Sequence, residues 1–301
     1  MNMKAAQISC ISRNDDDFPE LLKEIPSAPL NLYVLGNLSG LKAEEPKIAI
    51  VGTRKATEQG RTLAKELAKK LSEKGITIVS GLAMGIDTAA HEGAVAGQGK
   101  TIAVLANGLD SIYPRQNENL AKRILEFGGA IISEYPTGTP AYESQFLERN
   151  RIVSGLCAAT IIIEAPERSG SLVTARLAAE QGREVFVFPG PHNHPNYRGS
   201  HKLIRDGARL VASIEDILED LGLENPNFKT PNPKQIQNSK LERIKDENQL
   251  LIIKAVENAG EPLSIDKIIK LTKLEPQTAN QTIALLVIEE IIKETERGYS
   301  L

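Results

Sequence analysis

Between residues 47 and 221 the chain alternates short apolar segments with longer segments of helical periodicity. The first pair sets the pattern, because residues 47–51 are a mostly apolar run and residues 57–74 place Leu63, Leu67 and Leu71 at helical spacing. Short apolar strands joined by amphipathic helices need a parallel sheet that is covered on both faces. The alternation therefore predicts an α/β fold with an extended, doubly wound, mostly parallel Rossmann-like sheet.

The same alternation predicts the remaining elements of this domain. The expected strands are 47–51, 77–80, 101–105, 130–133, 160–163, 184–188 and 209–211, and the expected helices are 57–74, 85–96, 116–127, 151–157, 171–181, 200–206 and 214–221. Parallel strands of such a sheet end at one edge, and ligands bind there. We therefore expect the functional site among the turns that follow the strands.

The residues on either side of this domain, which spans 46–222, differ from it in composition. Residues 1–45 are expected to be an N-terminal arm or stub, with one edge strand at the apolar positions 30–35. Residues 223–246 are rich in Asn, Pro, Gln and Lys, which is typical of a linker. Residues 247–301 combine three amphipathic helices with a terminal hairpin. That combination predicts a small winged-helix-like C-terminal domain.

The composition excludes several classes of protein. The 301 residues carry a net charge of −3, so any site for a polyanion must be a local concentration of Arg and Lys. The two cysteines, Cys10 and Cys157, are too few for a disulfide framework and fit a reducing compartment, with the cytoplasm as the expected location. The sequence has no apolar run of about 18 residues and no apolar core of a signal peptide, so we expect neither a membrane span nor export.

Glycines, hydroxyl groups and arginines gather at the predicted carboxyl ends of the strands. The first strand is followed by Gly52-Thr53-Arg54-Lys55, the second by a turn with Gly81, and the fifth by residues 164–171. Glycine lets the backbone approach an anion, and helix N-termini and guanidinium groups supply donors for phosphate oxygens. Arginines accumulate at this rim, namely Arg54, Arg149, Arg151 and Arg168. The pattern predicts a phosphate-binding site.

Common nucleotide-binding motifs are absent from the sequence. No Gly-x-Gly-x-x-Gly follows the first strand, which argues against a dinucleotide site. Residues 97–101 resemble the end of a P-loop, but Ala94 occupies the place of its first glycine and the segment enters a strand, so we expect a helix-to-strand turn.

The ionisable side chains do not form a catalytic or metal-binding pattern. Asp87 lies one helical turn before His91, where it is expected to cap the helix by hydrogen bonds to backbone or to His91. Glu164 follows the fifth strand and is expected to orient an arginine. His192 and His194 are expected to belong to a polar loop. We therefore predict no catalytic residue, no metal and no cofactor.

Six motifs occur in order and together resemble the DNA-processing protein A (DprA/Smf) family. They are Ser80-Gly81-Leu82-Ala83-x-Gly85-Ile86-Asp87-x3-His91, Thr101 to Leu105 with Gly108 and Tyr113-Pro114, Ser133-Glu134, Phe146-x2-Arg149-Asn150-Arg151-Ile152, Glu164-Ala165-x2-Arg168-Ser169-Gly170-Ser171-x2-Thr174-Ala175, and Pro189-Gly190. The resemblance spans about residues 30–220.

The resemblance implies a non-catalytic protein that binds single-stranded DNA, forms homodimers and helps to load the recombinase RecA onto incoming DNA during natural transformation. It implies that Gly52, Thr53 and Arg54 contact the DNA phosphates and that Phe146 offers an aromatic surface to a base. It also implies that the rest of the pocket comes from Lys55, Gly81, Arg149, Asn150, Arg151, Arg168, Ser169, Gly170 and Ser171.

The sequence departs from the family pattern at a few positions near this site. Leu147 replaces the usual proline, and Glu143 and Glu148 place negative charge beside the expected phosphate path. A second family, the nucleoside monophosphate phosphoribohydrolases, combines a Rossmann fold with a glycine-rich phosphate turn, but the turn at residues 168–174 lacks their catalytic glutamate. A nucleotide-processing enzyme is therefore the alternative, and a protein scaffold without nucleic acid is a third.

The C-terminal segment is acidic. Residues 246–301 contain six Lys and Arg against ten Asp and Glu, and residues 275–288 contain no basic residue. A DNA-recognition helix needs cations for phosphate contacts. The segment therefore favours a protein-interaction or regulatory role.

Overall fold

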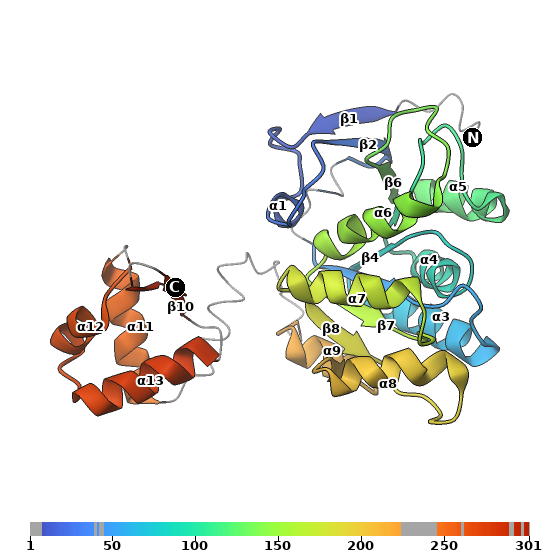
Figure 1. Ribbon diagram of the computed structural model, residues 1–301. Coiled ribbons are helices and arrows are strands. Elements are labelled where there is room, and N and C mark those ends of the chain that lie inside the picture. The colour runs from blue at the N-terminus through green and yellow to red at the C-terminus, as the bar shows by residue number, and fades with distance from the viewer. Residues whose placement is uncertain are drawn as a thin grey trace. The chain divides into compact units, whose positions relative to one another are not determined.

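The computed structural model describes residues 8–38, 41, 45–223, 246–259, 262–288, 292–295 and 298–300. The chain divides into two compact units, Met1–Thr230 and Pro231–Leu301 (Figure 1). The expected linker, residues 223–246, lies outside the described residues except for its two ends. None of the helices in the described part of the chain is both long and apolar enough to cross a membrane.

The first unit contains a nine-stranded, mostly parallel sheet in the order β1-β2-β6-β5-β4-β3-β7-β8-β9. The strands are β1 (Ser9–Ser12), β2 (Asn31–Gly36), β3 (Lys47–Val51), β4 (Thr77–Ser80), β5 (Thr101–Val104), β6 (Ala130–Ser133), β7 (Ala159–Ile162), β8 (Glu184–Val187) and β9 (Arg209–Leu210). The strands from β3 to β9 pair in parallel, so the predicted Rossmann-like α/β fold is confirmed.

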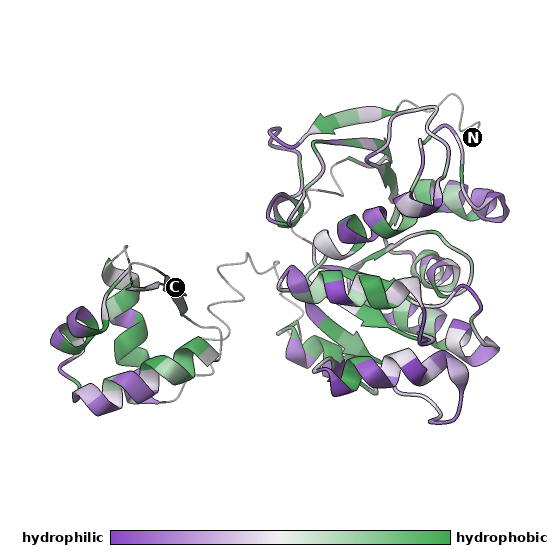
Figure 2. Ribbon diagram, in the orientation of Figure 1, coloured by the Kyte–Doolittle hydropathy of each residue, from purple (hydrophilic) through white to green (hydrophobic). Residues whose placement is uncertain are grey.

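Helices cover both faces of this sheet (Figure 1). They are α1 (Glu20–Lys23), α3 (Glu58–Glu73), α4 (Ile86–Ala96), α5 (Glu118–Glu126), α6 (Glu143–Gly155), α7 (Gly170–Glu180), α8 (Arg198–Arg205) and α9 (Ile214–Asp220), with short 3-10 turns at Arg115–Asn117 and Pro195–Tyr197. In β3, Ala49 and Val51 pack with α1, α6 and α7, whereas Ile48 and Ile50 pack with α3, α4 and α9. Figure 2 shows the corresponding hydrophobic strands between the helices.

The strand order reverses between β3 and β7. From β3 the chain passes outward through β4, β5 and β6, and it then returns to the other side of β3 to form β7, β8 and β9. The turns that follow β3 and β7 therefore diverge to opposite faces and leave a crevice at the carboxyl ends of these strands. The fold places the predicted turns at this crevice.

The N-terminal arm joins the same sheet. β2 pairs antiparallel with β6, and β1 pairs antiparallel with the outer side of β2. The apolar positions that predicted an edge strand do form β2, but β1 covers it because residues 9–12 turn back along it. The side chains of Leu32 and Val34 are buried in the core beneath α1 and α6.

Helix α6 begins eight residues before the position that the periodicity predicts. It starts at Glu143, where the Tyr142 backbone amide donates to the Gln145 side chain at 2.9 Å in a capping box. The prediction missed this start because Gln145 and Arg149 occupy buried positions on the inner face of the helix, where apolar residues are expected. Arg149 and Asn150 therefore lie on the same helix as Arg151 and not ahead of it.

The second unit contains three helices and a hairpin. The helices are α11 (Glu247–Ala259), α12 (Ile265–Thr272) and α13 (Pro276–Ile288), and the strands β10 (Lys293–Thr295) and β11 (Gly298–Ser300) pair antiparallel. Leu263, ahead of α12, bridges to Tyr299 in β11. A separate core holds this unit together and is built from Ile252, Ile253, Val256, Leu263, Ile268, Ile283, Leu286 and Ile292.

Candidate anion-binding site

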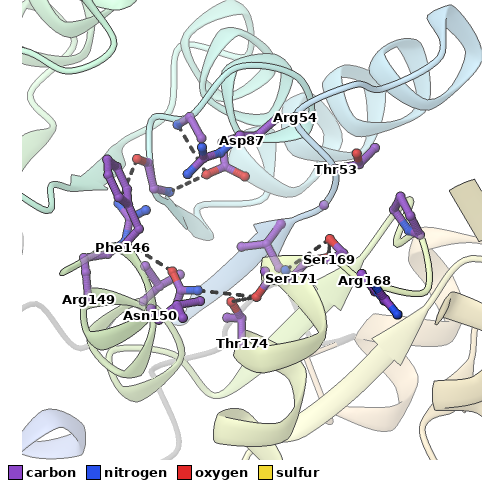
Figure 3. A pocket seen from close by; sticks show the side chains of 18 residues that line it. Thr53, Arg54, Asp87, Phe146, Arg149, Asn150, Arg168, Ser169, Ser171 and Thr174 are labelled. Atoms are coloured by element: carbon purple, nitrogen blue, oxygen red, sulfur yellow. Dashed lines mark hydrogen bonds between the residues drawn. The ribbon is translucent and has the colours of Figure 1, made fainter. Parts of the chain in front are cut away.

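A pocket of about 320 Å³ opens where the strand order reverses (Figure 3). We call it the switch-point pocket. Its walls are the turns after β3, β4 and β7, one side of α6 and the N-terminus of α7. The lining residues are Val51, Gly52, Thr53, Arg54, Gly81, Ala83, Asp87, Phe146, Leu147, Arg149, Asn150, Val153, Pro166, Arg168, Ser169, Gly170, Ser171 and Thr174. Eleven of the thirteen predicted site residues are in this set.

The turn after β3 is fixed by close backbone packing. A Cβ atom on Gly52 would lie 2.5 Å from the Ile86 side chain, so only glycine fits there. The Thr53 amide donates to the Glu164 carbonyl at 2.7 Å, which joins the turns after β3 and β7. Arg54 follows on an exposed position at the mouth of the pocket. The turn therefore presents one cation on a rigid backbone.

The N-terminus of α7 forms the opposite wall. Ser169 caps the helix, and its hydroxyl oxygen accepts from the Ser171 amide at 3.3 Å. The position where Gly170 would carry a Cβ atom has no other atom within 4 Å, so its backbone is open to a ligand. Arg168 is exposed beside this cap. Amide groups and the dipole at such a helix N-terminus favour bound anions.

Arg149 lies beneath the pocket and not at its mouth. Its side chain is almost wholly buried, and its guanidinium donates to the Gly81 carbonyl at 2.8 Å and also to the Val104 carbonyl. Burial lowers the pKa of Arg149 to about 10, although the Asp87 carboxylate opposes this shift. Arg149 thus ties α6 to the ends of β4 and β5 while adding positive charge below the pocket.

Asp87 holds the other side of the same turn. Its carboxylate accepts from the Gly81 amide at 3.1 Å and from the Ala83 amide at 3.4 Å, so the expected hydrogen bonds to backbone are present. They go to the turn before α4, whose N-cap is Gly85 without a side-chain hydrogen bond, so the prediction that Asp87 caps the helix is wrong. Burial raises the pKa of Asp87, and the neighbouring Arg149 lowers it in part. The backbone of Gly81 is therefore held on both sides, because its amide donates to Asp87 and its carbonyl accepts from Arg149.

His91 is buried one turn further along α4. Its Nδ1 atom lies 2.7 Å from the Thr101 hydroxyl. Burial lowers the pKa of His91 to about 3, and the charge of Arg149 adds to this effect. The imidazole is therefore neutral at physiological pH and belongs to the core beneath the site.

Arg151 and Lys55 are the two predicted site residues that do not line the pocket. Arg151 pairs with Glu134 at 2.5 Å on the other side of α6, because residues 149 and 151 are about 200° apart on a helix. Lys55 is exposed beyond the turn after β3, and its carbonyl accepts from the Asn196 side chain at 3.0 Å.

Phe146 is half-buried at the rim of the pocket. Its ring centroid lies 5.4 Å from that of Tyr113, and the Arg54 guanidinium carbon lies 5.0 Å from the Phe146 centroid. A cation over an aromatic face is a favourable contact. The three side chains therefore form one aromatic and cationic cluster. Tyr113 was not among the predicted site residues, and the sequence signal that could have included it is the aromatic residue of the Tyr113-Pro114 motif.

The acidic residues near α6 stay outside the pocket. Neither Glu143 nor Glu148 is among the lining residues, and the Glu148 carboxylate accepts from the Tyr135 hydroxyl at 2.8 Å. Among the described residues that line the pocket, Asp87 alone carries a carboxylate. One of its oxygens accepts hydrogen bonds from the Gly81 and Ala83 amides. The two carboxylates therefore do not line the pocket, and the opposition expected from their charges stays a prediction.

Glu164 does not orient an arginine, so this prediction is wrong. Its buried carboxylate accepts from the Thr57 amide at 3.0 Å, the Thr57 hydroxyl at 2.5 Å, the Asn196 side chain at 2.9 Å and the Tyr197 hydroxyl at 3.1 Å. Burial raises the pKa of Glu164, but these hydrogen bonds outweigh it and the net pKa is lowered. The carboxylate lies next to the N-terminus of α3, where it accepts from both the amide and the hydroxyl of the N-cap residue Thr57.

The described residues contain no group of three or more His, Cys, Asp and Glu side chains placed to hold a metal ion. The cationic groups at the mouth and the α7 N-terminus are instead suited to oxyanions such as phosphates.

The fold and the pocket define a doubly wound α/β protein with a cationic pocket at its switch point. A family model described as DNA recombination-mediator protein A matches residues 9–222. The chain belongs to this family, which is the DprA/Smf family.

Curated relatives and solved structures agree with this assignment. The chain is 44% identical over 211 residues to Protein Smf of Escherichia coli, and the match covers 70% of this chain and 56% of that protein. It is 41% identical over 224 residues to DNA processing protein DprA of Bacillus subtilis, with 74% of this chain and 75% of that protein covered. The matched region of a Synechocystis relative is 54% of its length. The chain thus spans little more than half of some relatives.

Two solved structures of DNA processing protein A have a fold similar to that of this chain. The Streptococcus pneumoniae protein has 41% identity and a TM-score of 0.66, and the match covers 72% of this chain and 75% of that one. The Helicobacter pylori protein has 32% identity and a TM-score of 0.65, with 72% and 97% covered. The Helicobacter pylori structure concerns the single-stranded DNA binding mode of that protein.

Proposed function

We propose that this chain binds single-stranded DNA in the switch-point pocket. The observation that carries the proposal is that Arg54, Arg168 and the N-terminus of α7 converge on one pocket at the carboxyl ends of β3 and β7. Phosphate oxygens accept charge-assisted hydrogen bonds from such groups. The single-stranded DNA binding of the Helicobacter pylori relative supports the same assignment for this chain.

The residues have different roles in this proposal. Arg54 and Arg168 contact phosphates from the mouth, and the backbone at Gly52, Thr53 and Gly170 approaches them from the walls. Phe146 and Tyr113 offer aromatic surface to a base, a contact that contributes about 1–3 kcal/mol per base in other proteins. Arg149 acts from below by holding the turn with Gly81, and Arg151 acts by holding α6 against Glu134.

We also propose that the protein protects incoming DNA and assists the loading of RecA during natural transformation or recombination, as a homodimer and without catalysing a reaction. The description of the family as a recombination mediator supports this role. The second unit, with three helices and a hairpin, is proposed to be a winged-helix-like domain that binds a protein partner or regulates the first unit. Its acidic composition supports a protein contact over a DNA contact.

The direct test is the binding of a fluorescent oligothymidylate, followed by anisotropy at several salt concentrations. Arg54→Ala should weaken binding about tenfold and reduce the salt slope by about one, because one phosphate contact is lost. Arg176→Ala is the matched control, since Arg176 is exposed on α7 and pairs with Glu180 outside the pocket. Wild-type protein that binds no oligonucleotide, or equal affinity for both variants, would contradict the proposal.

A further inference from the structure

A second hollow lies beside the switch-point pocket and shares Arg54 with it. We call it the α3–α4 groove, because its other lining residues come from these two helices and from the turn that leads into α4. Its cavity volume is about 500 Å³. The residues that matter for its chemistry are Arg54, Glu58, Arg61, Lys65, Met84 and Glu92.

The groove results from the way that α3 and α4 pack. A Cβ atom on Gly93 of α4 would lie 2.2 Å from the Lys65 carbonyl of α3, so the two helix backbones nearly touch there. Ala89, one turn earlier on α4, is buried and lines the groove. Small residues on α4 therefore leave a depression next to the long side chains of Arg61 and Lys65, which are one helical turn apart on α3.

The cations of the groove are available to an anion. Lys65 pairs with Glu92 at 3.3 Å, with the two side chains 52% and 41% exposed. Such an exposed pair contributes little to stability, so a phosphate can replace Glu92 as the partner of Lys65. The Arg61 guanidinium donates to the Ala56 carbonyl at 2.6 Å, and this contact holds it near the α3 N-terminus while its other donors remain for a ligand.

The groove also offers an apolar contact. Met84 lies in the turn before α4 and is 44% exposed. A polarizable thioether side chain is suited to pack against the face of a base. A single strand of nucleic acid is contacted in two ways, by cations at its phosphates and by flat or apolar side chains at its bases. The groove offers both kinds of contact.

We infer that a single strand held in the switch-point pocket continues past Arg54 into the α3–α4 groove, where Arg61 and Lys65 contact its phosphates and Met84 contacts a base. This inference rests on the proposed function and extends it to a second subsite. Glu58 and Glu92 lower the affinity of this subsite, because their charges oppose the phosphates.

The test uses the full chain and a length series of fluorescent oligothymidylates. Lys65→Ala and Arg61→Ala should weaken the binding of long oligonucleotides about threefold each and leave the shortest binding oligonucleotide unaffected. Glu92→Gln should tighten the binding of long oligonucleotides about twofold, because it releases Lys65. A gain in affinity cannot result from loss of folding, so Glu92→Gln keeps the test decisive even if Arg61→Ala disturbs the turn at Ala56.

The matched controls come from α7. Arg176 and Glu180 form an exposed pair at 3.6 Å outside both hollows, so Arg176→Ala and Glu180→Gln change the same charges elsewhere. If the groove variants match these controls at every length while Arg54→Ala still weakens binding, the strand leaves the pocket in another direction and the inference is wrong. If the wild type binds no oligonucleotide of any length, the proposed function fails, and the inference fails with it.

Discussion

At the scale of single residues, the site depends on buried polar groups that hold backbone in place. The amide of Gly81 donates to Asp87, and its carbonyl accepts from Arg149. These contacts fix one wall of the pocket without using an exposed charge. Buried polar groups are costly unless they are hydrogen-bonded, so each partner depends on the other.

Replacing Gly81 with alanine should disrupt this arrangement. The new Cβ atom would lie 2.5 Å from the Arg149 guanidinium and displace it from its carbonyl partners. We expect Gly81→Ala to lower the free energy of unfolding by about 1–3 kcal/mol, measured by urea denaturation. Gly170→Ala is the control, because its Cβ atom meets open space and should cause no such loss. Equal stability of the two variants would contradict this account.

Glu164 should make stability depend on acid pH. Its folded pKa lies below the ordinary value of 4.5, so its contribution is present above about pH 4.5 and is lost as pH falls through the folded pKa. Glu164→Gln should lower the free energy of unfolding by about 2–3 kcal/mol at pH 7, since hydrogen bonds to a charged acceptor are replaced. The difference from wild type should shrink below pH 4.5. A constant difference from pH 7 to pH 3 would show that the charge of Glu164 is not involved.

At the scale of elements, α6 separates three consecutive polar residues. Arg149 points to the strand ends, the Asn150 amide donates toward the Gly170 carbonyl at 3.4 Å, and Arg151 pairs with Glu134. Successive helical residues are about 100° apart, so a motif that reads as one basic cluster is divided among three surroundings. The helix forces this division, whereas a loop could turn all three side chains to one ligand.

Arg151→Ala should therefore affect stability more than DNA affinity. The Arg151 and Glu134 side chains are 18% and 16% exposed, so removing Arg151 leaves a partly buried carboxylate without its cation. We expect a loss of about 1–3 kcal/mol in the free energy of unfolding and less than a twofold change in oligonucleotide affinity under folding conditions. Denaturation and anisotropy on the same sample measure both. A tenfold loss of affinity with unchanged stability would instead place Arg151 at the DNA.

At the scale of the whole molecule, the two units have separate cores. The three cores of the first unit use residues between Ile8 and Leu223, and the core of the second uses residues between Ile252 and Tyr299. A unit with its own core can fold alone.

Thermal unfolding should therefore show two transitions. The larger first unit should account for most of the unfolding enthalpy, because this quantity scales with the number of ordered residues. Ile268→Ala in the core of the second unit should lower only the smaller transition. Differential scanning calorimetry of the full chain measures both. A single transition shifted as a whole by Ile268→Ala would mean that the units unfold together.

Local sequence patterns were sufficient to predict the α/β class, most of the strands and helices, and the turns that supply the pocket. These follow from local periodicity and from glycines at strand ends, which are properties of neighbouring residues. The start of α6 escaped prediction because Gln145 and Arg149 are polar residues in buried positions. Glu164 was assigned to the wrong partners, because Thr57, Asn196 and Tyr197 reach it only through the fold.

Which cations face the pocket depends on the packing of elements that are far apart in the sequence. In the sequence Arg54, Arg149, Arg151 and Arg168 are equivalent members of a basic rim. In the fold Arg54 and Arg168 are exposed at the mouth, Arg149 is buried below it and Arg151 is paired elsewhere. The physical reason is that charge belongs to a residue, whereas exposure and hydrogen-bond partners are set by which elements pack around it.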